Sequence, residues 1–163
     1  AHAPLRKPQV AAVIATGPGL KSAIEEQKFK VVLAKVFGIL LPTLTLDSGG
    51  DAQTLSRDPK VADEYTSDPL VHTQVTASWG KSMLEGIEVV YRNAPNFPLP
   101  LLLMHGTNDK LAYPSSSLTY AEVAPRDKLT LKMWDDFMHE LHTDPEKAAV
   151  FKVMVDWMDG HLN

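Results

Sequence analysis

Apolar residues along this chain follow two patterns, short continuous runs and longer stretches with helical spacing. The runs are QVAAVIAT at 9–16 and LLLM at 101–104, and a third segment, LTLKM at 129–133, alternates apolar and polar residues. Short apolar runs bounded by turn formers are typical of strands buried on both faces of a parallel sheet, and alternation is typical of a half-buried strand. We therefore predict three strands.

Helical spacing predicts two helices in the first part of the chain. One covers residues 29–41 and ends before Pro42, and the other begins at the N-cap Thr76 and stops at Asn93. The segment between them, residues 44–60, is rich in turn formers, so we expect it to be irregular.

Two further helices follow the second and third predicted strands. A helix at 115–123 has serines available for its N-cap, and Asp144-Pro145-Glu146 opens the last helix with a capping acid, a proline in the first turn and an acid at the positive end of the helix dipole. Strands that alternate with helices through short connections predict an α/β fold. The buried face of the last helix, which should end at Gly160, comprises Val150, Met154, Trp157 and Met158.

This pattern divides the chain into three parts. We expect residues 1–19 to hold a core strand and turn, residues 20–93 to form a mostly helical cap or lid, and residues 94–163 to form the last part of the core. The first helix of the insertion is apolar around much of its circumference, so it must be buried or must meet an apolar surface. We expect its apolar residues to cover an acyl pocket or to make transient contact with a membrane surface. These substrate-binding candidates are Phe29, Val32, Val36 and Leu40.

Composition narrows the classes of function. The 163 residues carry a net charge of −4 without a block of like charges, which argues against a nucleic-acid partner. The sequence contains no Cys, which excludes disulfides, a thiolate zinc site and a cysteine nucleophile and suits a reducing, cytoplasmic location. The longest apolar region, residues 31–46, is interrupted by Lys35 and Pro42 and falls short of the ~20 apolar residues that span a bilayer.

Two polar residues lie beyond the ends of adjacent predicted strands and carry the candidate chemistry. Asp109 follows the strand at 101–104, and His139 follows the strand at 129–133. In an open α/β sheet, the loops beyond the carboxyl ends of neighbouring strands meet at one edge. A carboxylate that accepts a hydrogen bond from one imidazole nitrogen leaves the other nitrogen free to take a proton from a nucleophile. We therefore predict that Asp109 and His139 form the acid–base half of a hydrolase triad.

Other interpretations of these residues remain open. Asp109 could serve only to cap a turn, and His139 could be a surface loop residue. Asp135 and Asp136 are alternative acids because they are nearer to His139 in the sequence. His105, at the end of its strand, is expected to be a structural residue bonded to nearby backbone.

Signals for a nucleophile, a metal or a cofactor are weak in this chain. The G-x-S-x-G turn that presents a hydrolase serine is missing, and Ser48 comes nearest, with Leu46 in place of the first glycine. The run from His139 to His142 departs from the H-E-x-x-H zinc motif because its second histidine stands one position early. The glycine-proline-glycine turn after the first strand lacks the later glycines and the lysine of dinucleotide and phosphate loops. We expect no metal and no cofactor.

A further set of segments occurs in a fixed order along the chain. The segments are SRDP at 56–59, Tyr65 with DPLVH at 68–72, PLLLMHGTND at 100–109 and HEL at 139–141. Together with an apolar strand that ends in Gly-Pro and a helical insertion, this order resembles the monoacylglycerol lipase-like branch of the α/β-hydrolases. The resemblance extends from about Val10 to Trp157.

The resemblance implies the C-terminal part of an α/β-hydrolase, with three parallel strands and a helical cap. It implies a carboxylic ester hydrolase for a small lipid-like or ester substrate, using a Ser-Asp-His triad in which Asp109 is the acid and His139 the general base. The family's N-terminal half, with its oxyanion loop and nucleophile elbow, has no counterpart here. We therefore expect that half of the same protein to be the partner of this chain, the serine to lie outside it, and the chain alone to be inactive.

Two further points bear on this interpretation. The first predicted strand would expose unpaired backbone groups along one side of so small a sheet, which agrees with a missing half. The alternative function is a non-catalytic α/β module that binds a lipid or a protein partner through the apolar insertion.

Overall fold

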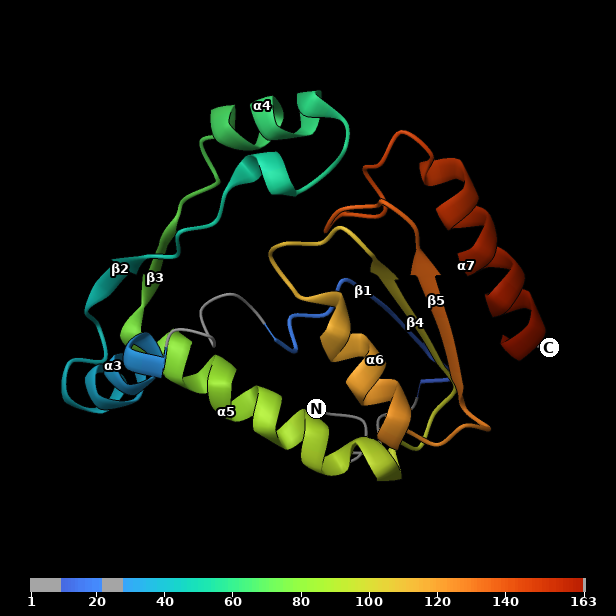
Figure 1. Ribbon diagram of the computed structural model, residues 1–163, viewed down its shortest axis with the longest axis horizontal. Helices are drawn as coiled ribbons and strands as arrows, with labels where there is room; N and C mark the ends of the chain where they lie inside the picture. Colours follow the sequence, from blue (N-terminus) through green and yellow to red (C-terminus); the bar gives the residue numbers. More distant parts are fainter. Residues whose placement is uncertain (1–9, 22–27, 163) are drawn as a thin grey trace.

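A parallel sheet of three strands forms the core of the structure, a computed structural model that describes residues 10–21 and 28–162. The strands are β1 (Val13–Thr16), β4 (Leu101–Gly106) and β5 (Leu129–Trp134), in the order β1-β4-β5 (Figure 1). Leu101 of the central strand lies beside Val13 on one side and Leu129 on the other. The predicted α/β fold with three parallel strands is confirmed.

The first strand is shorter than the sequence pattern predicts. β1 begins at Val13, whereas the apolar run begins at Gln9, which lies outside the described residues. Among the described strands, β1 pairs only with β4, so its other side is an edge of this sheet. This edge is the one that the sequence predicts for so small a sheet.

Helices cover both faces of the sheet. Side chains along β4 alternate between the faces, so the strand contributes apolar residues to both sides. Leu102 and Met104 pack in a cluster with α7, and Leu101 and Leu103 pack in a second cluster with α5 and α6 (Figure 1). Every residue of β4 is buried, as expected for a strand covered on both sides. The helices are α5 (Ala77–Asn93), α6 (Pro114–Val123) and α7 (Lys147–Leu162).

The last helix presents its predicted face to the sheet but differs at its ends. Asp144 caps the turn that leads into α7, since its carboxylate accepts a hydrogen bond of 2.9 Å from the Glu146 amide, and the helix itself begins only at Lys147. The helix continues through Gly160, its predicted end, where a single glycine costs only about 1 kcal/mol relative to alanine, and beyond it the His161 ring stacks on Trp157 at 4.1 Å. The predicted buried face is confirmed for Val150, Met154, Trp157 and Met158.

The N-terminus of α6 corrects the prediction of a serine cap. Its N-cap residue is Tyr113, which makes no side-chain capping bond, and Pro114 stands in the first turn. The Ser116 hydroxyl donates to the Tyr113 carbonyl oxygen (2.7 Å), and the Ser117 side chain is buried. Ser116 and Ser117 are thus buried rather than placed at the N-cap, and each has the hydrogen-bond partner that a buried polar group requires.

The insertion contains more regular structure than the sequence predicts. The first predicted helix is confirmed, and so is the N-cap Thr76, whose hydroxyl accepts a hydrogen bond from the Trp79 amide (3.2 Å). The expectation of irregular structure at 44–60 is wrong in part, because β2 pairs with β3 in an antiparallel ribbon. All residues of β2 are exposed, so no apolar alternation marks it. The elements are α3 (Lys28–Leu40), β2 (Thr45–Asp47), η1 (Ala52–Thr54), α4 (Pro59–Ser67) and β3 (Gln74–Thr76).

Helix α5 contacts both the insertion and the core. Gly38 of α3 lies against Ala77 near the start of α5, whereas Val90 and Tyr91 near its end pack against the core cluster. The helix gives way to η2 (Ala94–Asn96), which confirms the predicted stop. The boundary between a cap at 20–93 and the core therefore stays a prediction. Among the described helices, none has both the length and the apolar character that crossing a bilayer requires.

Candidate functional site

The loop after β4 presents Asp109 as a buried carboxylate with two differently engaged oxygens. The residue is only 3% exposed. Its Oδ1 accepts hydrogen bonds from the backbone amides of Leu111 and Ala112, each 2.9 Å long. The interpretation of Asp109 as a turn cap is thus correct for this oxygen, and Oδ2 remains for other partners.

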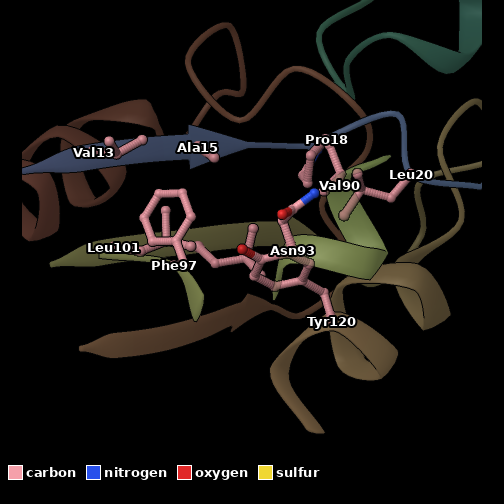
Figure 2. Close-up of a pocket in the computed structure, with 10 residues that line it drawn as sticks. Val13, Ala15, Pro18, Leu20, Val90, Asn93, Phe97, Leu101 and Tyr120 are labelled. Atoms are coloured by element: carbon pink, nitrogen blue, oxygen red, sulfur yellow. The ribbon is translucent and has the colours of Figure 1, made fainter. Parts of the chain in front are cut away.

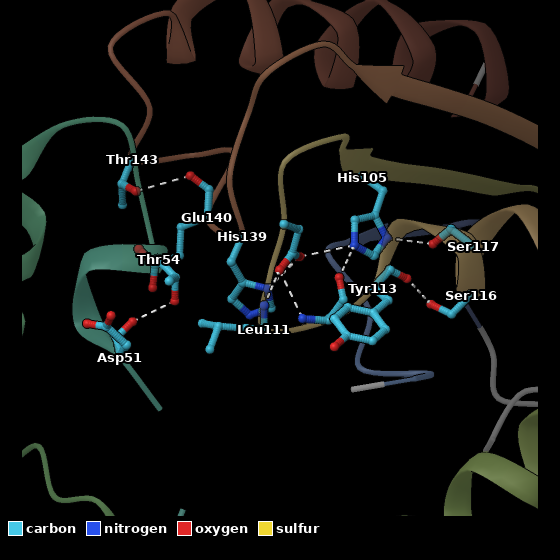
Figure 3. Close-up of polar contacts among 12 residues, drawn as sticks. Asp51, Thr54, His105, Leu111, Tyr113, Ser116, Ser117, His139, Glu140 and Thr143 are labelled. Atoms are coloured by element: carbon cyan, nitrogen blue, oxygen red, sulfur yellow. Dashed lines mark hydrogen bonds and ion pairs between the residues drawn. The ribbon is translucent and has the colours of Figure 1, made fainter. Parts of the chain in front are cut away.

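His139 is the partner of the second oxygen. It follows β5, and its Nδ1 lies 2.8 Å from Asp109 Oδ2 (Figure 3). The His139 side chain is 29% exposed, whereas the Asp109 side chain is fully buried. The two residues predicted from the ends of adjacent strands therefore lie in hydrogen-bond contact at one edge of the sheet, with the carboxylate inside and the imidazole at the surface.

This contact fixes what each group can do with a proton. When Nδ1–H donates to the carboxylate, Nε2 carries the lone pair and can accept a proton. The hydrogen bond to Asp109 raises the pKa of His139, although burial opposes this. Burial favours a raised pKa for Asp109, but hydrogen bonds from His105, His139 and the Ala112 amide outweigh it and hold that pKa well below its usual range. Asp109 is therefore a carboxylate at neutral pH, and the contact leaves Nε2 of His139 as an atom that can accept a proton.

His105 is a second imidazole on the same carboxylate, whereas its place at a strand end predicts only contact with nearby backbone. Its ring is fully buried, with Nε2 3.0 Å from Asp109 Oδ2 and 2.8 Å from the Ala112 carbonyl oxygen. Both partners are acceptors, so Nε2 carries the hydrogen, and Nδ1 meets the Ser117 hydroxyl at 2.7 Å (Figure 3). The available signal was the requirement that a buried polar residue at a strand end find partners.

Two glycines allow the His139 loop to approach the sheet. A Cβ on Gly106, the last residue of β4, would overlap the carbonyl oxygens of Phe137 and Met138. A Cβ on Gly17, just after β1, would lie 2.8 Å from the His139 carbonyl oxygen, and its φ of +49° also favours glycine. The sheet edge thus sets the position of the loop through backbone contact.

Replacing Gly106 by Ala should therefore destabilise the protein. Overpacking costs about 1–3 kcal/mol, and the upper end applies because the obstacle is backbone rather than a movable side chain. Urea unfolding monitored by tryptophan fluorescence measures the loss. Gly86→Ala in α5 is the matched control, because a Cβ there meets nothing within 4 Å and stability should hold or rise. Equal stability of both variants would contradict the proposed contact.

The alternative acids and the second histidine of the loop have other partners. The Asp135 carboxylate accepts a hydrogen bond of 3.2 Å from the Thr107 hydroxyl, and Asp136 occupies a turn position with φ of +59°. His142 is half exposed, and its Nε2 lies 4.0 Å from a Glu140 carboxylate oxygen. Of the three nearby acids, the structure therefore pairs Asp109 with His139.

Ser48, which comes nearest to the nucleophile motif, and the serines of α6 have structural surroundings. Ser48 lies beyond β2 in the insertion, where its backbone amide donates to the Thr73 carbonyl oxygen (2.7 Å). Ser116 and Ser117 bond to Tyr113 and His105. Among the hydrogen bonds described for His139, its Nδ1 contact is with Asp109 and none joins it to these serines.

The apolar candidates on α3 lie mostly at the surface. Val32, Val36 and Leu40 are 57%, 42% and 69% exposed, and the side chain of Phe29 lies outside the described residues. A separate apolar cavity of about 250 Å³ lies between β1, α5 and α6 (Figure 2). Its lining includes Val13, Ala15, Val90, Leu103 and Tyr120.

The parallel sheet, the helices on both of its faces and the acid–histidine contact beyond adjacent strands define the α/β-hydrolase class. Residues 1–146 match the family model described as serine aminopeptidase, S33 (Hydrolase_4), and the chain belongs to this family. The resemblance to its monoacylglycerol lipase-like members is confirmed by individual relatives.

Three relatives illustrate this similarity. The chain is 34% identical to the monoglyceride lipase of Rattus norvegicus over 136 residues, which cover 82% of this chain and 45% of that protein. It is 27% identical to the monoacylglycerol lipase of Mycolicibacterium smegmatis over 155 residues, which cover 94% of this chain and 55% of that protein. The crystal structure of the Paleococcus ferrophilus monoacylglycerol lipase matches with a TM-score of 0.92 at 31% identity, over 98% of this chain and 63% of that one. The chain thus spans about half the length of these two curated relatives.

Proposed function

We propose that the protein containing this chain hydrolyses carboxylic esters of lipid-like molecules through an acyl-serine intermediate. The observation that carries the proposal is the contact of 2.8 Å between buried Asp109 Oδ2 and partly exposed His139 Nδ1. The serine and the oxyanion donors would come from the half of the protein that this chain lacks. Three observations support that arrangement: the edge of β1 that pairs with no other described strand, the apolar cavity beside it, and the length of the relatives. Below, the complete protein means this chain together with that half.

Each residue of the pair has a defined task in this reaction. His139 Nε2 removes the serine proton while the serine oxygen attacks the ester carbonyl carbon, and the resulting imidazolium then gives the proton to the leaving alcohol oxygen. Water completes the cycle by the same proton path, which releases the acid and restores the serine. Asp109 holds the tautomer and stabilises the imidazolium. Without the serine, this chain alone should not turn over substrate.

The substrate class follows from the relatives and from the insertion. Monoglyceride lipases among the relatives make a monoacylglycerol or similar ester the first candidate. In the proposed cap, the exposed residues Val32, Val36 and Leu40 present an apolar face that lipid can cover, with Phe29 on the same helix. Burying such a face against lipid removes apolar area from water, which stabilises the bound state by about 25 cal/mol for each Å² buried. We propose that this face meets the substrate or touches the membrane surface that supplies it.

The same exposed face favours a second candidate, a non-catalytic module that binds lipid or a protein. A fluorophosphonate probe separates the two functions, because it reacts only with an activated serine. We expect the complete protein to be labelled and to hydrolyse a short p-nitrophenyl ester, with no labelling after heat denaturation. An aminoacyl nitroanilide tests the amide chemistry that the family description names. Folded protein that neither labels nor hydrolyses the ester would support the binding module.

A further inference from the structure

Arg57 joins the insertion to the loop that carries His139. It lies between η1 and α4, and its Nε and Nη2 donate to the two carboxylate oxygens of Asp144, each at 2.7 Å. Nη2 also donates to a Glu146 carboxylate oxygen at 2.8 Å. The Asp144 side chain is 1% exposed and the Arg57 side chain 29%, so this two-pronged pair is largely shielded from water. Shielding and bidentate geometry make such a pair stronger than an ordinary surface ion pair.

The same short segment contacts the loop at two more points. The Glu140 amide donates to the Leu55 carbonyl oxygen at 2.7 Å, and the Arg57 guanidinium lies 4.2 Å from the centre of the Phe137 ring. Phe137 precedes His139 by two positions, and Glu140 follows it directly. His139 is therefore held from both sides by contacts that originate in residues 55–57. Asp109, in contrast, is held by its own turn and by His105.

We propose that Arg57 is a positioning residue for His139, which couples the placement of the insertion to the alignment of the general base. This inference rests on the proposed ester hydrolysis. When residues 55–57 are in place, the loop holds the imidazole against Asp109 and toward the nucleophile. When they move, Phe137 and Glu140 move with them, and the imidazole loses its alignment while the carboxylate keeps its position.

The test compares Arg57→Gln, Arg57→Lys and wild type in the complete protein. A catalytic group misplaced by about 1 Å can cost roughly 10²-fold in rate, so Arg57→Gln should lower kcat by about 10- to 100-fold with KM nearly unchanged. The kcat of Arg57→Lys should lie between those of wild type and Arg57→Gln, because lysine keeps the charge but cannot bind both carboxylate oxygens or stack on the Phe137 ring. Lys152→Ala is the matched control, since it removes an exposed ion pair of 2.7 Å with Asp156 on α7 and should leave kcat unchanged.

The pH dependence separates positioning from a merely structural role. The charged groups that act on His139 are Asp109 and Glu140, and the hydrogen bond to Asp109 raises its pKa above the ordinary 6.5. The acid limb of kcat/KM should therefore lie above pH 6.5 in wild type and shift to lower pH in Arg57→Gln, because a looser contact stabilises the imidazolium less. A purely structural ion pair would leave the limb in place.

Two measurements keep the result decisive. If Arg57→Gln unfolds, the double variant Arg57→Met with Asp144→Leu replaces the pair by apolar groups and avoids an unpaired buried carboxylate. The proposal would be overturned if the double variant folds, keeps the wild-type kcat and shows no shift in the acid limb of its kcat/KM pH profile. An NMR titration of the His139 ring protons reports the same pKa without any turnover. If wild type does not hydrolyse the ester but the His139 titration shifts in Arg57→Gln, the proposed function alone is rejected. If the His139 titration does not shift in Arg57→Gln, the positioning role alone is rejected.

Discussion

Replacing His139 by Ala in the complete protein should lower kcat/KM for a p-nitrophenyl ester by roughly 10⁴-fold or more, as loss of the histidine does in other serine hydrolases. The imidazole is the group that Asp109 orients, and Nε2 is the atom left to take a proton. Without it, the serine keeps its hydrogen and remains a weak nucleophile. Initial rates measure the loss, and fluorophosphonate labelling should disappear in parallel.

His142→Ala is the control for the His139 variant. His142 belongs to the same loop but is half exposed and has only a distant contact with Glu140. Its removal should leave both the rate and the unfolding midpoint close to wild type. Hydrolysis that survives in folded His139→Ala, or that is lost equally in both variants, would remove His139 from the mechanism.

The elements that the sequence predicted well are those with a strong local signal. The apolar run at 101–104 is short and bounded by turn formers, which is typical of a fully buried strand, and the structure buries every residue of β4. The face of α7 was also readable, because Val150 and Trp157 repeat at helical spacing and fill the cluster under the sheet. Once adjacent parallel strands are assumed, the positions of Asp109 and His139 follow from chain order alone.

The elements that the sequence missed depend on contacts between distant residues. All residues of β2 are exposed and β3 is only partly buried, so the polarity of these residues does not predict the β2–β3 ribbon. Arg57 and Asp144 are separated by 87 positions, and locally each shows only a turn or capping signal. The Asp-Pro-Glu segment does cap a turn, and the same carboxylate also binds the arginine. A local rule that is satisfied gives no hint that the residue has a second partner.

Asp109 shows why two interpretations of one residue need not compete. One oxygen caps the turn at Leu111 and Ala112, which fixes the orientation of the carboxylate. The other oxygen accepts from His139 and His105, which is possible only because the first is occupied and the plane is fixed. The turn is thus the device that aims the acid at the imidazole, and the local signal and the chemical role come from the same side chain.

Asp109→Asn should consequently affect both catalysis and stability. If the amide oxygen replaces Oδ1 in the turn, the NH₂ group faces His139 and the Nε2–H of His105. His139 must then accept at Nδ1, which puts its hydrogen on Nε2 and blocks proton removal, so kcat should fall by roughly 10⁴-fold. The NH₂ group also opposes a buried donor on His105, which should cost about 1–3 kcal/mol of unfolding free energy.

The pH dependence of stability provides an independent check on Asp109. Folding lowers the pKa of Asp109 from its ordinary 3.8, so the carboxylate contributes stability above that pH and loses it as the pH falls toward the lowered value. The same contact raises the pKa of His139 above 6.5, so it stabilises the fold most where Asp109 is charged and His139 is protonated. The stability difference between wild type and Asp109→Asn should therefore be largest between about pH 4 and pH 6.5 and should shrink below about pH 4. Urea unfolding at several pH values measures this difference.

Asp135→Asn is the control, because that carboxylate only meets an exposed Thr107 hydroxyl, and its kcat and pH profile should match wild type. A stability difference for Asp109→Asn that does not change with pH would mean that the carboxylate is not charged in the folded protein, and the acid–base pair would lose its physical basis.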